Sequence, residues 1–211
     1  MIQTWMDSRE KQLILDCLTD NMTMLEWGSG GSTLEFSSIV DKYYSIEHNK
    51  DWYDKISTEL KKYPLNDVTY KYVKQNSENT LGKQSEYHMY KDYIDIVDKF
   101  NVKFDVVLID GRARRLCAKK IIPYLNPDSI VFIHDYVLRT AYWVVEDYYE
   151  LIDCIYDTQQ TIGKFKLKTI PIENAYDLTL KGTDRLMIQS DEISRNIKSK
   201  IKYENINNTT K

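Results

Sequence analysis

Glycine, proline, cysteine and histidine are scarce in this sequence of 211 residues, which contains seven, four, three and three of them. The three cysteines, Cys17, Cys117 and Cys154, lie far apart and form no CxxC pair, so neither a zinc site nor a disulfide framework is indicated. The N-terminus lacks the pattern of a signal peptide, and no apolar run approaches the roughly 18 residues that span a bilayer. We therefore expect a cytoplasmic location, in a reducing compartment and without a membrane span.

A strong excess of either charge is also missing. The 29 basic and 32 acidic residues leave a net charge of −3, and the sequence has no basic stripe that would attract the phosphates of a nucleic acid. The hydrophobic fraction of 42% is spread along the chain, which is typical of a globular domain. No nucleic acid partner is expected, and the composition does not indicate an oligomeric state.

The spacing of apolar residues alternates between the helical and the strand period. It predicts helices over residues 10–20, 32–40, 50–63, 86–100, 115–125 and 138–150, and strands over 22–27, 42–47, 67–75, 103–110 and 128–135. Three more strand-like stretches, 149–157, 163–170 and 183–190, follow without a long helix between them, so we expect them to pair antiparallel. The prediction is one α/β domain over 1–197, Rossmann-like and doubly wound, with a mainly parallel sheet and an antiparallel C-terminal edge. The polar residues 198–211 are expected to form a flexible tail.

Three of the seven glycines lie within residues 28–31, directly after the first predicted strand. The motif is E-x-G-x-G-x-S, formed by Glu26, Gly28, Gly30 and Ser32, and Ser32 stands three residues before Glu35, as in a helix-capping box. Glycines permit a tight turn and a close approach of backbone N–H groups to the anionic groups of a ligand. The motif is not a P-loop, and it lacks the third glycine of a dinucleotide fingerprint. An ordinary turn is the alternative interpretation.

An acidic residue, Glu47, ends the second predicted strand, 19 positions after Gly28. At that place a carboxylate can accept hydrogen bonds from both hydroxyls of a ribose. A solvated surface glutamate is the alternative, but the apolar strand just before Glu47 favours ribose binding. Together with the glycine-rich turn, Glu47 indicates a ligand that contains adenosine.

Three segments carry the motifs at the ends of the predicted strands: residues 25–33 (LEWGSGGST), 44–56 (YSIEHNKDWYDKI) and 104–136 (FDVVLIDGRARRLCAKKIIPYLNPDSIVFIHDY). They resemble class I S-adenosylmethionine-dependent methyltransferases. More narrowly, IDGR-x-R after the fourth strand and HD after the fifth are similar to motifs of small viral and bacterial sugar (glycan) O-methyltransferase domains, such as those of large algal DNA viruses. The resemblance covers roughly residues 20–140, where it implies a cofactor-binding core. For a viral protein, the expected location would be the host cytoplasm.

The resemblance implies S-adenosylmethionine as the cofactor and S-adenosylhomocysteine as the product. By this resemblance, Glu26, Gly28 and Gly30 hold the methionine part and its flanking backbone, and Glu47 holds the ribose. His48 and Trp52 are candidates to border the adenine, with core packing as the alternative for Trp52. The implied cofactor-binding residues are Glu26, Gly28, Ser29, Gly30, Ser32, Glu47, His48 and Asp110.

Asp110, His134 and Asp135 end the fourth and fifth predicted strands, where the methyl group of the cofactor is expected. A hydroxyl acceptor is poorly acidic, so a base within hydrogen-bond reach should remove its proton. In one mechanism Asp110 or His134 is this base, and Asp135 orients the histidine or the acceptor. In the other, Asp110 and Asp135 ligate Mg²⁺, which makes a bound hydroxyl more acidic. The metal-free mechanism is favoured because His134 is a poor ligand for magnesium.

Arg112, Arg114 and Tyr136 stand next to these residues in the sequence and are candidates to bind the acceptor. Arginine is suited to bidentate hydrogen bonds with oxygen atoms. The favoured function is O-methylation of a sugar hydroxyl of a glycan or glycoconjugate by in-line transfer. The alternatives are a methyltransferase for a small phenol, a protein or a nucleic acid, a catalytically inactive nucleotide-binding domain, and an NAD-dependent oxidoreductase.

Overall fold

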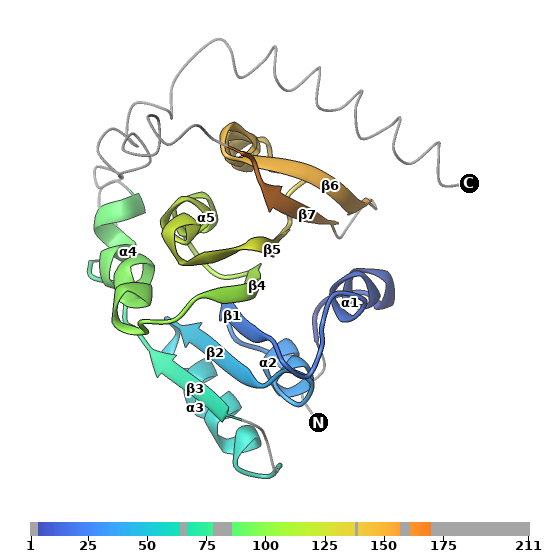
Figure 1. Cartoon of the computed structure of the whole chain (residues 1–211). Helices are drawn as coiled ribbons and strands as arrows, with labels where there is room; N and C mark the ends of the chain where they lie inside the picture. The colour runs from blue at the N-terminus through green and yellow to red at the C-terminus, as the bar shows by residue number, and fades with distance from the viewer. Residues whose placement is uncertain (1–3, 64–66, 78–85, 138, 157–160, 170–211) are drawn as a thin grey trace.

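A computed structural model of the chain describes residues 4–63, 67–77, 86–137, 139–156 and 161–169 (Figure 1). Its centre is a seven-stranded sheet in the order β3-β2-β1-β4-β5-β7-β6. The strands are β1 (Thr23–Trp27), β2 (Lys42–Glu47), β3 (Asp67–Tyr72), β4 (Phe104–Ile109), β5 (Leu125–His134), β6 (Tyr149–Tyr156) and β7 (Thr161–Leu167). Strands β1 to β5 are parallel, whereas β7 pairs antiparallel with both β5 and β6. This architecture confirms the predicted parallel sheet with an antiparallel C-terminal edge.

Helices cover both faces of the sheet (Figure 1). The α-helices are α1 (Ser8–Leu15), α2 (Gly31–Phe36), α3 (Lys50–Leu60), α4 (Glu86–Asp95) and α5 (Arg114–Lys120), and the 3-10 helices are η1 (Ile96–Lys99), η2 (Ile122–Tyr124) and η3 (Thr140–Asp147). Successive strand residues point to opposite faces. Leu25 and Val107 therefore join one core with α4, α5 and η3, while Met24 and Val106 join a second core with α1 and α2. Within the described ranges, no helix has the length and apolar character needed to cross a membrane.

Several predicted elements differ in extent from the structure. The first helix begins at Ser8 because the Asp7 side chain accepts hydrogen bonds from the backbone N–H groups of Arg9 and Glu10 and so caps it. The predicted helix 86–100 is divided into α4, which is kinked at Tyr90, and η1. The stretch 138–150 contains the 3-10 helix η3 in place of an α-helix. The predicted strand 183–190 and tail 198–211 lie outside the described residues.

The carboxyl ends of β1, β2, β4 and β5 meet at one edge of the sheet because these strands are parallel. They end at Trp27, Glu47, Ile109 and His134. The strand order reverses between β1 and β4, since the chain first builds outward to β3 and then crosses to the other side of β1. In open α/β sheets, this is the place where ligands bind.

Candidate functional site

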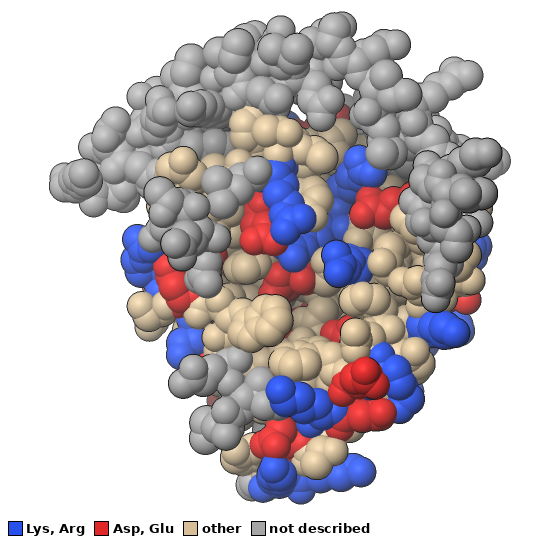
Figure 2. Space-filling model, turned by 180° about the vertical axis from the view of Figure 1, so that it is seen from behind, with Lys and Arg blue, Asp and Glu red and all other residues tan. Residues whose placement is uncertain are grey.

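A cavity of about 730 Å³ lies at this edge of the sheet, within the range of small-molecule sites. Figure 2 shows the molecule from behind, with a hollow near the middle of that face and acidic, basic and uncharged side chains around it. The cavity is lined by Thr4, Trp5, Met6, Gly28, Ser29, Gly30, Gly31, Ser32, Glu47, His48, Asn49, Asp51, Trp52, Lys55, Asp110, Gly111, Arg112, Arg114, His134 and Asp135. Of the site residues predicted from the sequence, all line this cavity except Glu26 and Tyr136.

The two glycines of the predicted motif are glycine for different reasons. Gly28 has a φ of 94°, and a Cβ atom there would lie 2.6 Å from the backbone nitrogen of Gly111. The β1–α2 turn therefore touches the loop after β4, and no side chain fits between the two backbones. Gly30 has a φ of −174°, which any residue adopts, and its Cβ would meet only Ser32 Oγ, at 3.7 Å. Nothing in the part of the chain that the structure describes requires glycine at position 30, so the missing side chain leaves cavity space open.

Glu26 lies beneath the turn, outside the cavity lining. Its fully buried carboxylate accepts hydrogen bonds from the hydroxyls of Ser32, Thr33 and Ser45. Burial raises the pKa of Glu26 to about 7, although these hydrogen bonds oppose the rise. Glu26 thus ties α2 to β1 and β2, and the prediction that it holds the cofactor directly does not agree with its position.

The predicted capping box of Ser32 and Glu35 is wrong. The residue that caps α2 is Gly30, whose N–H donates to Oγ1 of Thr33 at 2.9 Å. The Ser32 hydroxyl donates to Glu26 instead. The threonine at the place of a third fingerprint glycine therefore joins the turn to the buried carboxylate below it.

Glu47 presents a carboxylate to the cavity from the end of β2. Oε2 accepts hydrogen bonds from the backbone nitrogen and Oγ of Ser29, at 3.0 and 3.1 Å. Oε1 accepts from the backbone nitrogens of His48 and Asn49, at 2.8 and 2.7 Å. Burial raises the pKa of Glu47, but contacts with His48, Asn49 and Ser29 outweigh it and leave the pKa below its ordinary value. The carboxylate is therefore charged at neutral pH.

These four donors, together with Nδ1 of His48 at 3.0 Å from Oε1, surround the Glu47 carboxylate. One of them, the Ser29 hydroxyl, also lies 2.6 Å from the hydroxyl of Tyr70. The Ser29 hydroxyl can form a hydrogen bond with Tyr70 in place of Glu47. An acceptor position on Oε2 of Glu47 is then open for a ligand hydroxyl.

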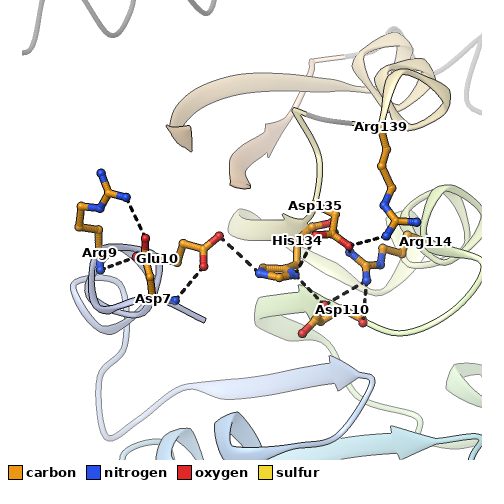
Figure 3. A network of polar contacts seen from close by, with 8 residues as sticks. All are labelled: Asp7, Arg9, Glu10, Asp110, Arg114, His134, Asp135 and Arg139. Carbon is orange, nitrogen blue, oxygen red and sulfur yellow. Dashed lines mark hydrogen bonds and ion pairs between the residues drawn. The ribbon is translucent and has the colours of Figure 1, made fainter. Parts of the chain in front are cut away.

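Asp110, His134 and Asp135 form a charged network with Arg114 (Figure 3). Oδ1 of Asp110 lies 2.9 Å from Nδ1 of His134 and 3.2 Å from Nη2 of Arg114. Nη1 of Arg114 lies 3.1 Å from Oδ2 of Asp135, and Arg139 contacts the same oxygen at 3.0 Å. Arg114 also donates to the backbone carbonyls of Asp110 and His134. The three residues predicted as catalytic are thus brought together, and Arg114 belongs to their network.

The second ring nitrogen of His134 faces Glu10, which the sequence analysis did not single out. Nε2 of His134 lies 3.4 Å from Oε1 of this fully buried residue of α1. Nε2 and Oε1 of Glu10 form no hydrogen bond in the described structure, so their contact is an ion pair, and a carboxylate near each ring nitrogen favours the charged imidazolium form. Burial lowers the pKa of His134, but contacts with Asp110 and Glu10 outweigh it and raise the pKa to about 10. A charged imidazole has no lone pair to accept a proton, so this raised pKa favours Asp110 over His134 as the candidate base.

Arg114 also bears on the predicted magnesium alternative. Its two terminal nitrogens lie between the carboxylates of Asp110 and Asp135, in the space that an ion bridging them would need. In the part of the chain that the structure describes, no group of three or more His, Cys, Asp or Glu side chains is arranged to hold a metal ion.

The predicted acceptor residues are placed differently from one another. Arg112 is exposed and lines the cavity. Tyr136 is fully buried, and its hydroxyl donates to Glu146 at 2.5 Å. Asp135 has a φ of 58°, which turns the chain sharply after β5 and carries Tyr136 into the core. The prediction that Tyr136 binds the acceptor is wrong for this reason.

Two tryptophans border the cavity. Trp5 is 79% exposed, and its ring lies against that of Trp52 with 5.8 Å between the centroids. Nε1 of Trp52 donates to the backbone carbonyl of Ser29, and Nζ of Lys55 lies 4.5 Å from the centre of the Trp52 ring. Of the two interpretations of Trp52, the structure favours a place at the cavity over core packing. Trp5 has no local signal in the sequence, because it precedes the first predicted helix.

Several solved structures share this fold. A methyltransferase-like protein from Silicibacter pomeroyi matches with a TM-score of 0.64 and 22% identity, over 84% of this chain and 95% of that one. A precorrin-6y C5,15-methyltransferase from Geobacter metallireducens matches with a TM-score of 0.55 and 16% identity, over 77% and 90% of the two chains. An rRNA methylase from Streptococcus thermophilus matches with a TM-score of 0.55 and 9% identity, over 75% and 94%. No protein-family model and no curated protein matches the chain. The chain thus has the Rossmann-like fold of class I methyltransferases.

Proposed function

We propose that this protein is an S-adenosylmethionine-dependent methyltransferase whose acceptor is a sugar hydroxyl of a glycan or glycoconjugate. The observation that carries the proposal is the pairing of Gly30 and Glu47 across one cavity. A Cβ would fit at Gly30 among the described residues, so the glycine leaves open space beside the turn, and Glu47 offers a charged carboxylate at the end of the neighbouring strand. Both features suit a ligand with a ribose and an adjoining chain that runs along the backbone of the turn.

The residues of the cavity fit this cofactor. Glu47 would hold the ribose hydroxyls, with the Ser29 hydroxyl turned to Tyr70. The turn around Gly30 would allow the backbone to approach the methionine part. When bound, the cofactor supplies an electrophilic methyl group on a sulfonium sulfur.

Asp110 is the residue that we assign to the acceptor hydroxyl. Its Oδ1 is held by His134 and Arg114, and in the described part of the chain no ion pair or hydrogen bond engages Oδ2. Oδ2 can therefore accept a hydrogen bond from the hydroxyl and take its proton as the new C–O bond forms. Two neighbouring cations weaken a carboxylate as a base, so orientation of the hydroxyl is the larger part of this role.

The rim of the cavity supports a sugar as the acceptor. A pyranose ring has an apolar face and a hydroxyl-bearing edge, and Trp5 and Trp52 provide aromatic surface for the face. Asp51, Lys55 and Arg112 line the same cavity and can bind the edge. Their mixed signs, together with the net charge of −3, disfavour a nucleic acid backbone.

Calorimetry with S-adenosylhomocysteine tests the cofactor. We expect wild type to bind S-adenosylhomocysteine. Glu47→Ala should bind it more weakly by about 1–3 kcal/mol, because the ribose hydroxyls lose their acceptor. Asp128→Ala, an exposed position outside the cavity lining, is the matched control. Binding of NAD in place of S-adenosylhomocysteine would contradict the proposal.

Methyl transfer to mono- and oligosaccharides tests the acceptor. Asp110→Asn should lower the rate by about 10² or more, the usual scale for a lost acid–base group, with cofactor binding largely kept. Transfer to phenols or peptides but to no saccharide would move the proposal to another acceptor. Tight cofactor binding without transfer to any of them would favour a catalytically inactive domain.

A further inference from the structure

We propose that Glu10 is a positioning residue, which acts through His134 to fix the carboxylate of Asp110 (Figure 3). The role of Asp110 rests on the proposed function, whereas the contacts that join the three residues do not depend on it. Glu10 lies on α1 and Asp110 follows β4, so the two carboxylates reach the ring of His134 from elements far apart in the sequence.

Glu10 is itself held before it meets the histidine. Its Oε2 accepts a hydrogen bond from the backbone nitrogen of Asp7 at 3.0 Å, and Oδ1 of Asp7 accepts one from the backbone nitrogen of Glu10 at 2.9 Å. This reciprocal capping box fixes the Glu10 side chain at the N-terminus of α1. The side chain is 0% exposed, and a buried carboxylate is costly unless a charged group faces it. His134 is the charged group that faces Oε1.

The imidazole ring is thereby held at both ends. Asp110 lies at Nδ1, at 2.9 Å, and Glu10 lies at Nε2, at 3.4 Å. The other charged groups around His134 are Asp135, whose Oδ1 lies 3.7 Å from Nδ1, and Arg114, which donates to the backbone carbonyl of the histidine. With Glu10 in place, Nδ1 keeps its proton and its direction toward Oδ1 of Asp110. Oδ1 of Asp110 keeps its contact with the imidazole ring, and Oδ2 is the oxygen that remains for the acceptor hydroxyl.

The chain offers a matched control for this role. Glu35 on α2 also holds the N-terminal segment, through Nζ of Lys11 at 3.2 Å and Oγ1 of Thr4 at 3.3 Å. It makes no contact with His134 in the described structure. Glu35→Gln therefore loosens the attachment of α1 without changing the charge that faces the ring. A role of Glu10 in docking α1 alone would make Glu10→Gln and Glu35→Gln behave alike.

The titration of His134, followed by NMR of the imidazole nitrogens and assigned with His134→Gln, tests the proposal without any need for catalysis. In wild type, both ring nitrogens should carry protons at pH 8. In Glu10→Gln the midpoint should fall by about one to three pH units, the usual effect of one opposite charge nearby, and in Glu35→Gln it should stay. A ring nitrogen without a proton in wild type at pH 8 would overturn the proposal even if a variant fails to fold. An unchanged midpoint in Glu10→Gln, or an equal shift in Glu35→Gln, would overturn it as well.

The rate of methyl transfer gives the second readout. Glu10→Gln should lower kcat about tenfold or more with little change of the KM for the cofactor, and Glu35→Gln should leave both unchanged. An equal kcat in wild type and Glu10→Gln would contradict positioning of Asp110. If wild type binds no S-adenosylhomocysteine, the proposed function fails while the NMR result still decides the contact between Glu10 and His134.

Discussion

Gly28 and Gly111 face each other so closely that a Cβ on Gly28 would lie 2.6 Å from the backbone nitrogen of Gly111. In the reverse direction, a Cβ on Gly111 would meet the hydroxyl of Tyr93 and the backbone nitrogen of Gly28, at 2.0 and 3.0 Å. The turn after β1 and the loop after β4 are thus fitted to each other before any ligand arrives. Both glycines line the cavity, as do Glu47 and Asp110.

The same substitution at two glycines should separate folding from binding. Gly28→Ala should destabilise the fold by about 2–5 kcal/mol, because it adds both left-handed strain and overlap with Gly111. Gly30→Ala should keep the stability within about 1 kcal/mol, since a Cβ fits there. It should weaken S-adenosylhomocysteine binding tenfold or more, about 1.4 kcal/mol. Urea denaturation and calorimetry measure the two effects, and equal binding by wild type and Gly30→Ala would contradict the assignment of that space to the cofactor.

Much of this site follows from the order of strands in the sequence. Continuous apolar runs at β4 and β5 and a glycine-rich stop after β1 predict a parallel sheet, and such a sheet brings its strand ends together. Glu47, Asp110 and His134 could therefore be expected at one edge. Glu10, which contacts His134, and Trp5, which lines the cavity, could not, because they carry no motif of their own and their places depend on tertiary packing. The burial of Tyr136 depends on the left-handed turn at Asp135, which strand patterning does not show.

Glu26→Ala should lower the free energy of unfolding without removing a contact to the ligand. It leaves the buried hydroxyls of Ser32, Thr33 and Ser45 without their acceptor. The expected loss is about 3 kcal/mol or more, since one unsatisfied buried group already costs about 1–3 kcal/mol. Urea denaturation measures this loss. Calorimetry on the folded fraction should show nearly wild-type affinity for S-adenosylhomocysteine, and a loss as large as that of Glu47→Ala would mean that Glu26 touches the cofactor after all.

The raised pKa of Glu26 also predicts a pH dependence. Burial raises this pKa from 4.5 to about 7, so between these values the folded state binds a proton that the unfolded state has released. The contribution of Glu26 to stability should therefore fall as the pH rises from 4.5 to 7. Glu26→Gln cannot titrate, and the difference in unfolding free energy between wild type and this variant isolates the effect. A difference that is constant across this range would show that Glu26 keeps an ordinary pKa.

Two substitutions around Glu47 should affect the affinity for the cofactor differently. Ser29→Ala removes the hydroxyl that competes for the carboxylate, so affinity for S-adenosylhomocysteine should hold or rise. Tyr70→Phe removes the alternative partner of the Ser29 hydroxyl and keeps it on Glu47. Affinity should then fall about 2- to 10-fold, the value of one net hydrogen bond of about 0.5–1.5 kcal/mol. Calorimetry compares the two variants, and a loss in Ser29→Ala larger than that in Tyr70→Phe would assign the hydroxyl to the cofactor itself.

The stabilisation that His134 provides should be lost in alkaline solution. Its contacts with Asp110 and Glu10 raise its pKa from 6.5 to about 10 against the effect of burial. The folded state then holds a proton that the unfolded chain releases above pH 6.5, so the stabilisation is complete below that pH and is lost as the pH rises toward 10. The loss is at most about 1.4 kcal/mol per pH unit. Urea denaturation of wild type and His134→Gln from pH 6 to 9.5 should show the difference between them shrinking as the pH rises. Parallel curves would mean that the imidazole is already neutral at pH 7, and His134 would return as a candidate for the base.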